Sequence, residues 1–85
     1  MPSGTKSRPR GVALVVVGLL NDERERQSVT QEYLAALTQI SQSQLSRILA
    51  GTKSMTVTEL FRMCMVLGLT ASDLVAEAEL RMGHR

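Results

Sequence analysis

The sequence predicts a small all-α domain of five helices, and three observations lead to this prediction. Four Ser or Thr residues each follow one apolar residue and precede another four positions on, which is typical of a capped helix start. Gly51 and Gly68 stand where helices of ordinary length would end. Between these signals the apolar residues recur at helical spacing, and no segment shows a clear strand pattern.

Length and composition limit what such a domain can do. The chain has 85 residues, of which 44% are hydrophobic and 2% aromatic, so its core must be aliphatic. The few aromatic side chains offer no stacking platform for single-stranded nucleic acid. One domain is all that this length allows, and no nucleophile with its base, carboxylate pair or phosphate loop can be assembled. We therefore expect a protein that is not an enzyme.

Residues 1–11 are expected to form a flexible basic arm. Its cations precede an apolar run that ends at Leu20, which imitates a secretory signal. The charged segment 21–26 follows in place of a cleavage site, and the run is too short to span a membrane. Together with the single cysteine, this predicts a cytoplasmic protein.

The first helix is expected over residues 12–26. Its valines would permit a strand, but the segment continues into residues that favour helix. The stripe expected to face the core consists of Val12, Val16 and Leu19 or Leu20. Three further apolar residues would lie on the other faces of this helix, outside the core stripe: Leu14, Val15 and Val17.

Further helices are expected over 31–38, 42–50, 57–67 and 71–82, with a tail at 83–85. The predicted N-caps are Thr30, Ser41, Thr56 and Thr70. Capping boxes are indicated for three of them by the side chains of Gln44, Glu59 and Asp73. Residues 12–82 would thus form the folded domain.

The connection between the helices over 31–38 and 42–50 consists of three residues only, which suits a sharp helix-turn-helix. In such a unit the first helix crosses the DNA backbone and the second lies in the major groove. The second helix has a suitable pattern, because Leu45, Ile48 and Leu49 share an inner face. Its outer surface would carry Gln42, Ser43, Ser46 and Arg47.

Residues 31–50, QEYLAALTQISQSQLSRILA, resemble the motif of the lambda-repressor/Cro (XRE) helix-turn-helix family. The matching positions are Leu34, Ala35, Ile40, Leu45 and Ile48, and the resemblance extends over about residues 12–80. Two positions depart from the pattern. Gln39 stands where the family usually has Gly, and Thr38 where it usually has an apolar residue, so we expect a reshaped or partly strained turn.

The resemblance implies that Gln31 binds a phosphate and braces Gln42, and that Gln42, Ser43 and Arg47 face base edges. Gln can pair with adenine and Arg with guanine, each contact contributing roughly 1–3 kcal/mol of discrimination. Ser46 would reach either a base or a phosphate. Two roles stay open for Gln44, which either completes the capping box of Ser41 or contacts the DNA backbone.

Backbone contacts are expected beyond the second helix of the motif, where a loop and a helix start favour phosphate binding. The residues concerned are Thr52, Lys53, Ser54 and Thr56. The cations of the arm either extend this contact or remain in solvent; they are Lys6, Arg8 and Arg10.

The last helix has more apolar surface than a small bundle can bury. Its second stripe, Val75, Ala78 and Met82, is a candidate homodimer face, which would set two reading helices about 34 Å apart on a pseudo-palindromic operator. A core-only role for this stripe and a rival face on the helix over 12–26 stay open. Cys64 is expected in the core, and His84 has no neighbour with which to hold a metal.

The sequence therefore predicts a sequence-specific regulator of transcription that binds double-stranded DNA, without a cofactor, small-molecule ligand or membrane partner. The favoured form is a phage or bacterial repressor that acts by promoter occlusion. Two alternatives stay open: an antitoxin that represses its own toxin–antitoxin operon, and a helix-turn-helix module that binds only a protein.

Overall fold

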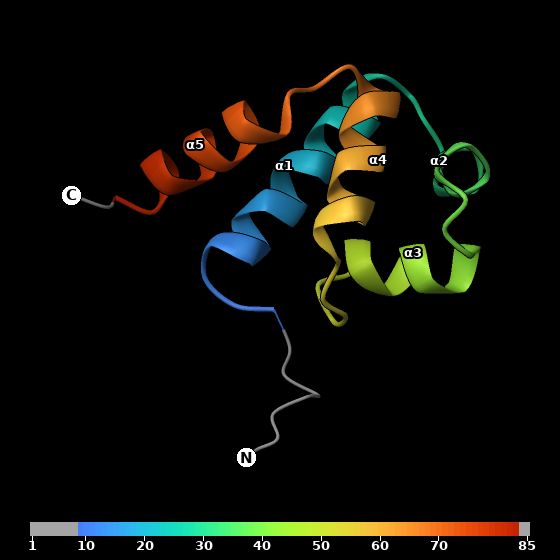
Figure 1. Cartoon of the computed structure of the whole chain (residues 1–85), viewed down its shortest axis with the longest axis horizontal. Coiled ribbons are helices and arrows are strands. Elements are labelled where there is room, and N and C mark those ends of the chain that lie inside the picture. Colours follow the sequence, from blue (N-terminus) through green and yellow to red (C-terminus); the bar gives the residue numbers. More distant parts are fainter. Residues whose placement is uncertain (1–8, 84–85) are drawn as a thin grey trace, which may run out of the picture.

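A computed structural model describes residues 9–83 of the chain, which form five helices and no strand (Figure 1). The helices are α1 (Val12–Arg26), α2 (Gln31–Thr38), α3 (Gln42–Leu49), α4 (Val57–Leu67) and α5 (Ala71–Arg81). The all-α prediction is confirmed. Three predicted ranges match, while α3 and α5 each end one residue earlier than expected. Lys6, Arg8 and the tail residues 84–85 lie outside the described residues.

The predicted helix starts are confirmed at three of the four caps. The hydroxyl of Thr30 accepts from Tyr33 N at 3.0 Å, and that of Ser41 accepts from Gln44 N at 3.1 Å. Thr56 and Glu59 form a complete capping box. The box predicted at Thr70 is wrong, because its side chain makes no capping bond. Its ψ of 123° also differs from the 147° to 164° of the bonded caps.

Both predicted glycine stops are confirmed. Gly51 and Gly68 have φ values of 80° and 73°, a left-handed conformation that costs glycine little. After α4, Leu69 N donates to Cys64 O at 2.8 Å. After α3, Thr52 N donates to Arg47 O at 3.0 Å. These bonds satisfy carbonyl groups that a helix end leaves open and turn the chain sharply.

The core is aliphatic, as its composition requires, and Cys64 lies in it as predicted, where burial raises the pKa of its thiol. The expected inner face of α1 is partly wrong: Val17 is buried, whereas Val12 is exposed. Val17 lines a hollow together with Pro9 and Met55, and Pro9 is itself buried. Pro9, just before α1, therefore lies near a side of that helix that was expected to lie outside its core stripe.

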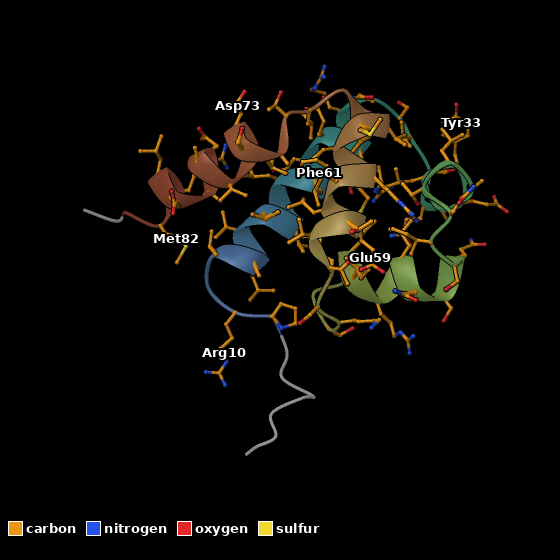
Figure 2. The ribbon with its side chains drawn as sticks, viewed as in Figure 1. Arg10, Tyr33, Glu59, Phe61, Asp73 and Met82 are labelled. Atoms are coloured by element: carbon orange, nitrogen blue, oxygen red, sulfur yellow. The ribbon has the colours of Figure 1, made fainter. Side chains whose placement is uncertain are left out.

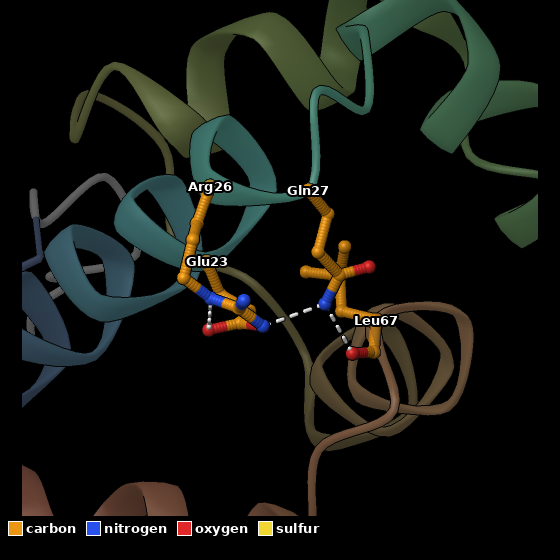
Figure 3. Close-up of polar contacts among 4 residues, drawn as sticks. All are labelled: Glu23, Arg26, Gln27 and Leu67. Atoms are coloured by element: carbon orange, nitrogen blue, oxygen red, sulfur yellow. Dashed lines mark hydrogen bonds and ion pairs between the residues drawn. The ribbon is translucent and has the colours of Figure 1, made fainter.

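Polar contacts from α1 and its C-cap residue hold the ends of α3 and α4. Asn21 Nδ2 donates to Leu49 O at 2.8 Å, which ties α1 to the end of α3. Gln27 Nε2 donates to Leu67 O at 2.7 Å and so holds the end of α4 (Figure 3). Glu23 accepts from both Arg26 and Gln27, and these bonds lower its pKa to about 2. α5 packs mainly on α1.

Candidate nucleic-acid interface

The turn between α2 and α3 keeps a helix-turn-helix geometry, although Thr38 and Gln39 are not the residues that the family usually has at these two positions. Gln39 adopts the left-handed conformation, with φ 63° and ψ 25°, in which a glycine would be free of strain. Thr38 is buried, and its hydroxyl donates to Leu34 O at 2.7 Å. The expected local strain is thus present at Gln39, and the polar group of Thr38 is satisfied.

α3 presents a polar face to solvent. Leu45, Ile48 and Leu49 are buried, in agreement with the prediction. The four residues predicted to read bases are all exposed: Gln42, Ser43, Ser46 and Arg47. The helix lies along one edge of the molecule, so this face is open (Figure 1). The structure therefore brings these four side chains together on one accessible helix.

Gln44 has a different partner from the one that a capping box would give it. Its Nε2 donates to Oε2 of Glu59 at 2.5 Å, and the side chain is half-buried. Of the two roles left open for the Gln44 side chain, the capping-box role is contradicted, because Glu59 on α4 is within reach and holds the amide. Glu59 also accepts from Thr56 N at 2.8 Å through its other oxygen. One carboxylate therefore joins the first turn of α3 to the first turn of α4 (Figure 2).

The loop after α3 and the start of α4 lie beside this face. Thr52 and Ser54 are exposed and Lys53 is half-buried, and the Thr52 hydroxyl donates to Arg47 O at 3.2 Å. Thr56 is exposed as the N-cap of α4. The first turn of a helix leaves N–H groups without a helical partner, and the capping box uses those of Thr56 and Glu59. The N–H groups of Val57 and Thr58, also in this first turn, are not used by the capping box.

The remaining residues predicted to contact DNA belong neither to α3 nor to the loop after it. Gln31 is half-buried at the start of α2, and Arg10 is exposed before α1. Figure 2 shows Arg10 at the lower edge of the molecule, the edge along which α3 also runs. Lys6 and Arg8, the other two arm cations, lie outside the described residues.

The stripe on α5 that was expected to pair two chains is largely used within one chain. Ala78 is fully buried in the core, and Val75 is half-buried against it. Ala78 must therefore be removed from the candidate dimer face. Met82 is partly exposed and reaches toward Gly11.

Three supporting residues were not found from the sequence. Asn21 holds the last turn of α3, Glu59 holds its first turn, and Arg62 Nη1 donates to Thr38 O at 3.3 Å beside the turn. Glu59 was identified only as a capping acid. These contacts join residues 15 to 28 positions apart, and no local pattern signals them.

Two further features of residues 9–83 bear on function. Within this part of the chain, no three His, Cys, Asp or Glu side chains are grouped so as to hold a metal ion. None of its helices is long and apolar enough to cross a membrane.

A short turn that presents a polar recognition helix defines the class of helix-turn-helix domains. A family model described as helix-turn-helix matches residues 20–74, more than half of the chain, and the chain belongs to this family. Its fold is similar to that of the clp gene regulator ClgR from Corynebacterium glutamicum, known from a crystal structure. The TM-score is 0.77 and the identity 26%, over 91% of this chain and 81% of that chain. No curated protein matches the chain. Family and fold together support a DNA-binding regulator of transcription.

Proposed function

We propose that this protein regulates transcription by binding a specific double-stranded DNA sequence, with α3 in the major groove. The carrying observation is the two-sided character of α3. Its apolar side chains are buried, while Gln42, Ser43, Ser46 and Arg47 stand free on the other face. Amide and guanidinium groups are the side chains that pair bidentately with adenine and guanine.

Phosphate contacts are assigned to the groups that surround α3. Lys53 supplies a positive charge and the start of α4 supplies free N–H groups, neither of which distinguishes bases. The other proposed backbone contacts are Gln31, Thr52, Ser54 and Thr56. Gln44 is proposed to act indirectly, because its amide is already bonded to Glu59.

The proposed mode of regulation is repression by promoter occlusion, which requires nothing beyond DNA binding. The residues proposed above would supply the reading helix and its phosphate contacts. A two-fold operator would be read by two copies of the chain, whose recognition helices would lie about 34 Å apart.

Selection from a random pool of duplex DNA, followed by titration at several salt concentrations, tests this function. Binding through n phosphates predicts that log affinity falls with log salt at a slope near −0.9n. Arg47→Ala is expected to relax the base preference at one position of the operator. Lys53→Ala is expected to weaken binding to all DNA sequences alike and to reduce the magnitude of the salt slope by about one.

Arg81→Ala is the matched control, because it removes an exposed cation from α5, where that residue pairs with Glu77. It should leave both preference and slope unchanged. If Arg47→Ala loses affinity with no change in preference, Arg47 is not a base reader. An absence of saturable DNA binding would contradict the proposed function and favour a module that binds a protein.

A further inference from the structure

α4 carries an apolar stripe that nothing within the described chain covers. Val57, Phe61 and Met65 are 75%, 58% and 78% exposed. Their spacing of four residues places them in line on one face of the helix. Figure 2 labels Phe61 halfway along α4. Three large exposed apolar side chains aligned on one helix face form a candidate site of association.

A recess lies directly beside this α4 stripe. It encloses about 240 Å³ and is lined by Phe61, Cys64, Met65, Leu69, Thr70 and Ala71. Two residues of the stripe therefore also form the wall of the recess. One face of the molecule thus offers both projecting apolar side chains and a hollow to receive them, which is the self-complementary form that a two-fold interface requires.

The charged side chains of α4 point away from the stripe. Glu59 is bonded to Gln44 on α3, and Arg62 donates to Thr38 O at the end of α2. The recess has no charged residue in its lining. The recess can therefore lose its water without the burial of an ionised group of its own lining, whose desolvation would cost several kcal/mol.

We propose that the α4 stripe is the homodimer face, covered by the same stripe of a second copy of this chain. α4 begins at the loop after α3 and rises from the level of that helix (Figure 1). A two-fold axis running along α4 brings like residues together and leaves both α3 helices on the same side of the dimer. A two-fold operator needs that arrangement.

This face replaces the α5 stripe considered from the sequence, since Ala78 is buried. A specific interface buries roughly 800 Å² on each partner, more than three side chains provide. Free chains therefore associate weakly, and pairing is strengthened when both copies occupy adjacent half-sites. The operator symmetry rests on the proposed function, whereas the association of free chains does not.

Sedimentation of the full chain over a range of concentrations tests the face. We expect Phe61→Glu and Met65→Glu to raise the dimer dissociation constant at least tenfold. Leu80→Glu is the matched control, because Leu80 is 74% exposed on α5 and lies outside the stripe. It should associate like the unaltered chain. Circular dichroism checks that each variant is folded. If Phe61→Glu unfolds, the dimer dissociation constant of Met65→Glu tests the face.

Electrophoresis on one half-site and on two half-sites separates this proposal from the proposed function. The Met65→Glu chain should bind one half-site normally and lose cooperativity on two. The face is wrong if the unaltered chain stays monomeric in solution and occupies two half-sites independently, or if Met65→Glu associates like it. If no DNA is bound but free chains pair through the stripe, the proposed function fails and the face stands.

Discussion

Gln39 adopts a strained backbone conformation, and this conformation lets α3 leave α2 at a sharp angle. Its left-handed backbone places the Cβ atom close to the following carbonyl oxygen, at a cost of roughly 1–2 kcal/mol. The buried Ile40 that follows has to reach the core from this turn. The burial of Ile40 and of the inner face of α3 holds the strained residue in place.

Gln39→Gly is expected to raise the free energy of unfolding by roughly 0.5–1 kcal/mol. The strain is removed, and the greater chain entropy of unfolded glycine offsets part of the gain. Urea denaturation measures the change. Ala36→Gly, at an exposed interior position of α2, is the control and should lower the free energy by about 1 kcal/mol. Equal losses in both variants would mean that Gln39 is not strained.

The bond between Gln44 and Glu59 determines how α3 sits against the start of α4. Glu59 already completes the capping box, so its carboxylate is fixed before Gln44 reaches it. A hydrogen bond to a charged group is stronger than one between neutral groups. This bond therefore relates α3, the proposed base-reading helix, to the proposed phosphate contacts at Thr56.

A double-mutant cycle on Gln44→Ala and Glu59→Ala is expected to show a coupling energy of roughly 1 kcal/mol in urea denaturation. Ser46→Ala combined with Glu59→Ala is the control and should be additive, because Ser46 is exposed on the other side of α3. Additivity in the Gln44 cycle would show that the bond contributes nothing in solution.

The helices themselves follow from local signals, which explains why the sequence predicted them closely. Caps and left-handed glycines act within one turn of the chain, so Thr30, Ser41 and Gly68 could be recognised without knowledge of the fold. The failures have a tertiary origin. Val17 is buried at a hollow that it lines together with residues distant in sequence such as Met55, and Gln44 is bonded to a residue of α4.

Two glycines are expected to respond in opposite ways to alanine. Gly18 lies within α1, and a Cβ atom there would meet no heavy atom within 4 Å. Gly18→Ala should therefore raise the free energy of unfolding by roughly 0.5–1 kcal/mol. At Gly51 the Cβ would lie 3.1 Å from Leu14 Cδ2, on a backbone with φ 80°.

Gly51→Ala should accordingly lower the free energy of unfolding by at least about 1 kcal/mol. Thermal and urea denaturation of the two variants side by side measure both effects. If Gly51→Ala proves neutral, the contact between α1 and the end of α3 is looser than the structure shows.

At the scale of the whole molecule, the net charge of +2 averages two unlike regions. Arg47 and Lys53 lie on or beside the proposed DNA face, whereas α5 carries three acidic residues and one basic residue. Figure 2 shows Asp73 of α5 at the edge opposite Arg10. This distribution would orient the protein as it approaches DNA.

Stability of the whole fold is expected to depend on pH through Glu23. Its pKa is lowered from 4.5 to about 2 by Arg26 and Gln27, and Gln27 also binds the end of α4. A depressed pKa stabilises the fold above the unfolded value of 4.5. That contribution should be lost as the pH falls from 4.5 toward 2. Urea denaturation at a series of pH values measures it.

Glu23→Gln should flatten this part of the pH profile. Asp22→Asn makes the same charge change on the same helix while leaving the bonds to Arg26 and Gln27 intact, and serves as the control. If the two variants alter the profile alike, the contacts of Glu23 are not the cause of the acid dependence.

The candidate site could be predicted from the sequence as a set of exposed residues, but not as a supported structure. The helical period alone assigns Ser43 and Arg47 to the outer face of α3. It cannot show that Asn21 and Glu59 hold the ends of that helix, because both come from other helices. The apolar stripe on α4 also needs the fold, which shows which side of α4 the core leaves uncovered.

The support at both ends of α3 has a consequence for the entropy of recognition. A helix of eight residues would be marginal in isolation. Here Glu59 restrains its first turn and Asn21 its last, so the helix is ordered before any ligand arrives. Little backbone freedom of α3 would then remain to be lost on binding, so the entropic cost would be confined to the side chains and to the rigid-body motion of the partners.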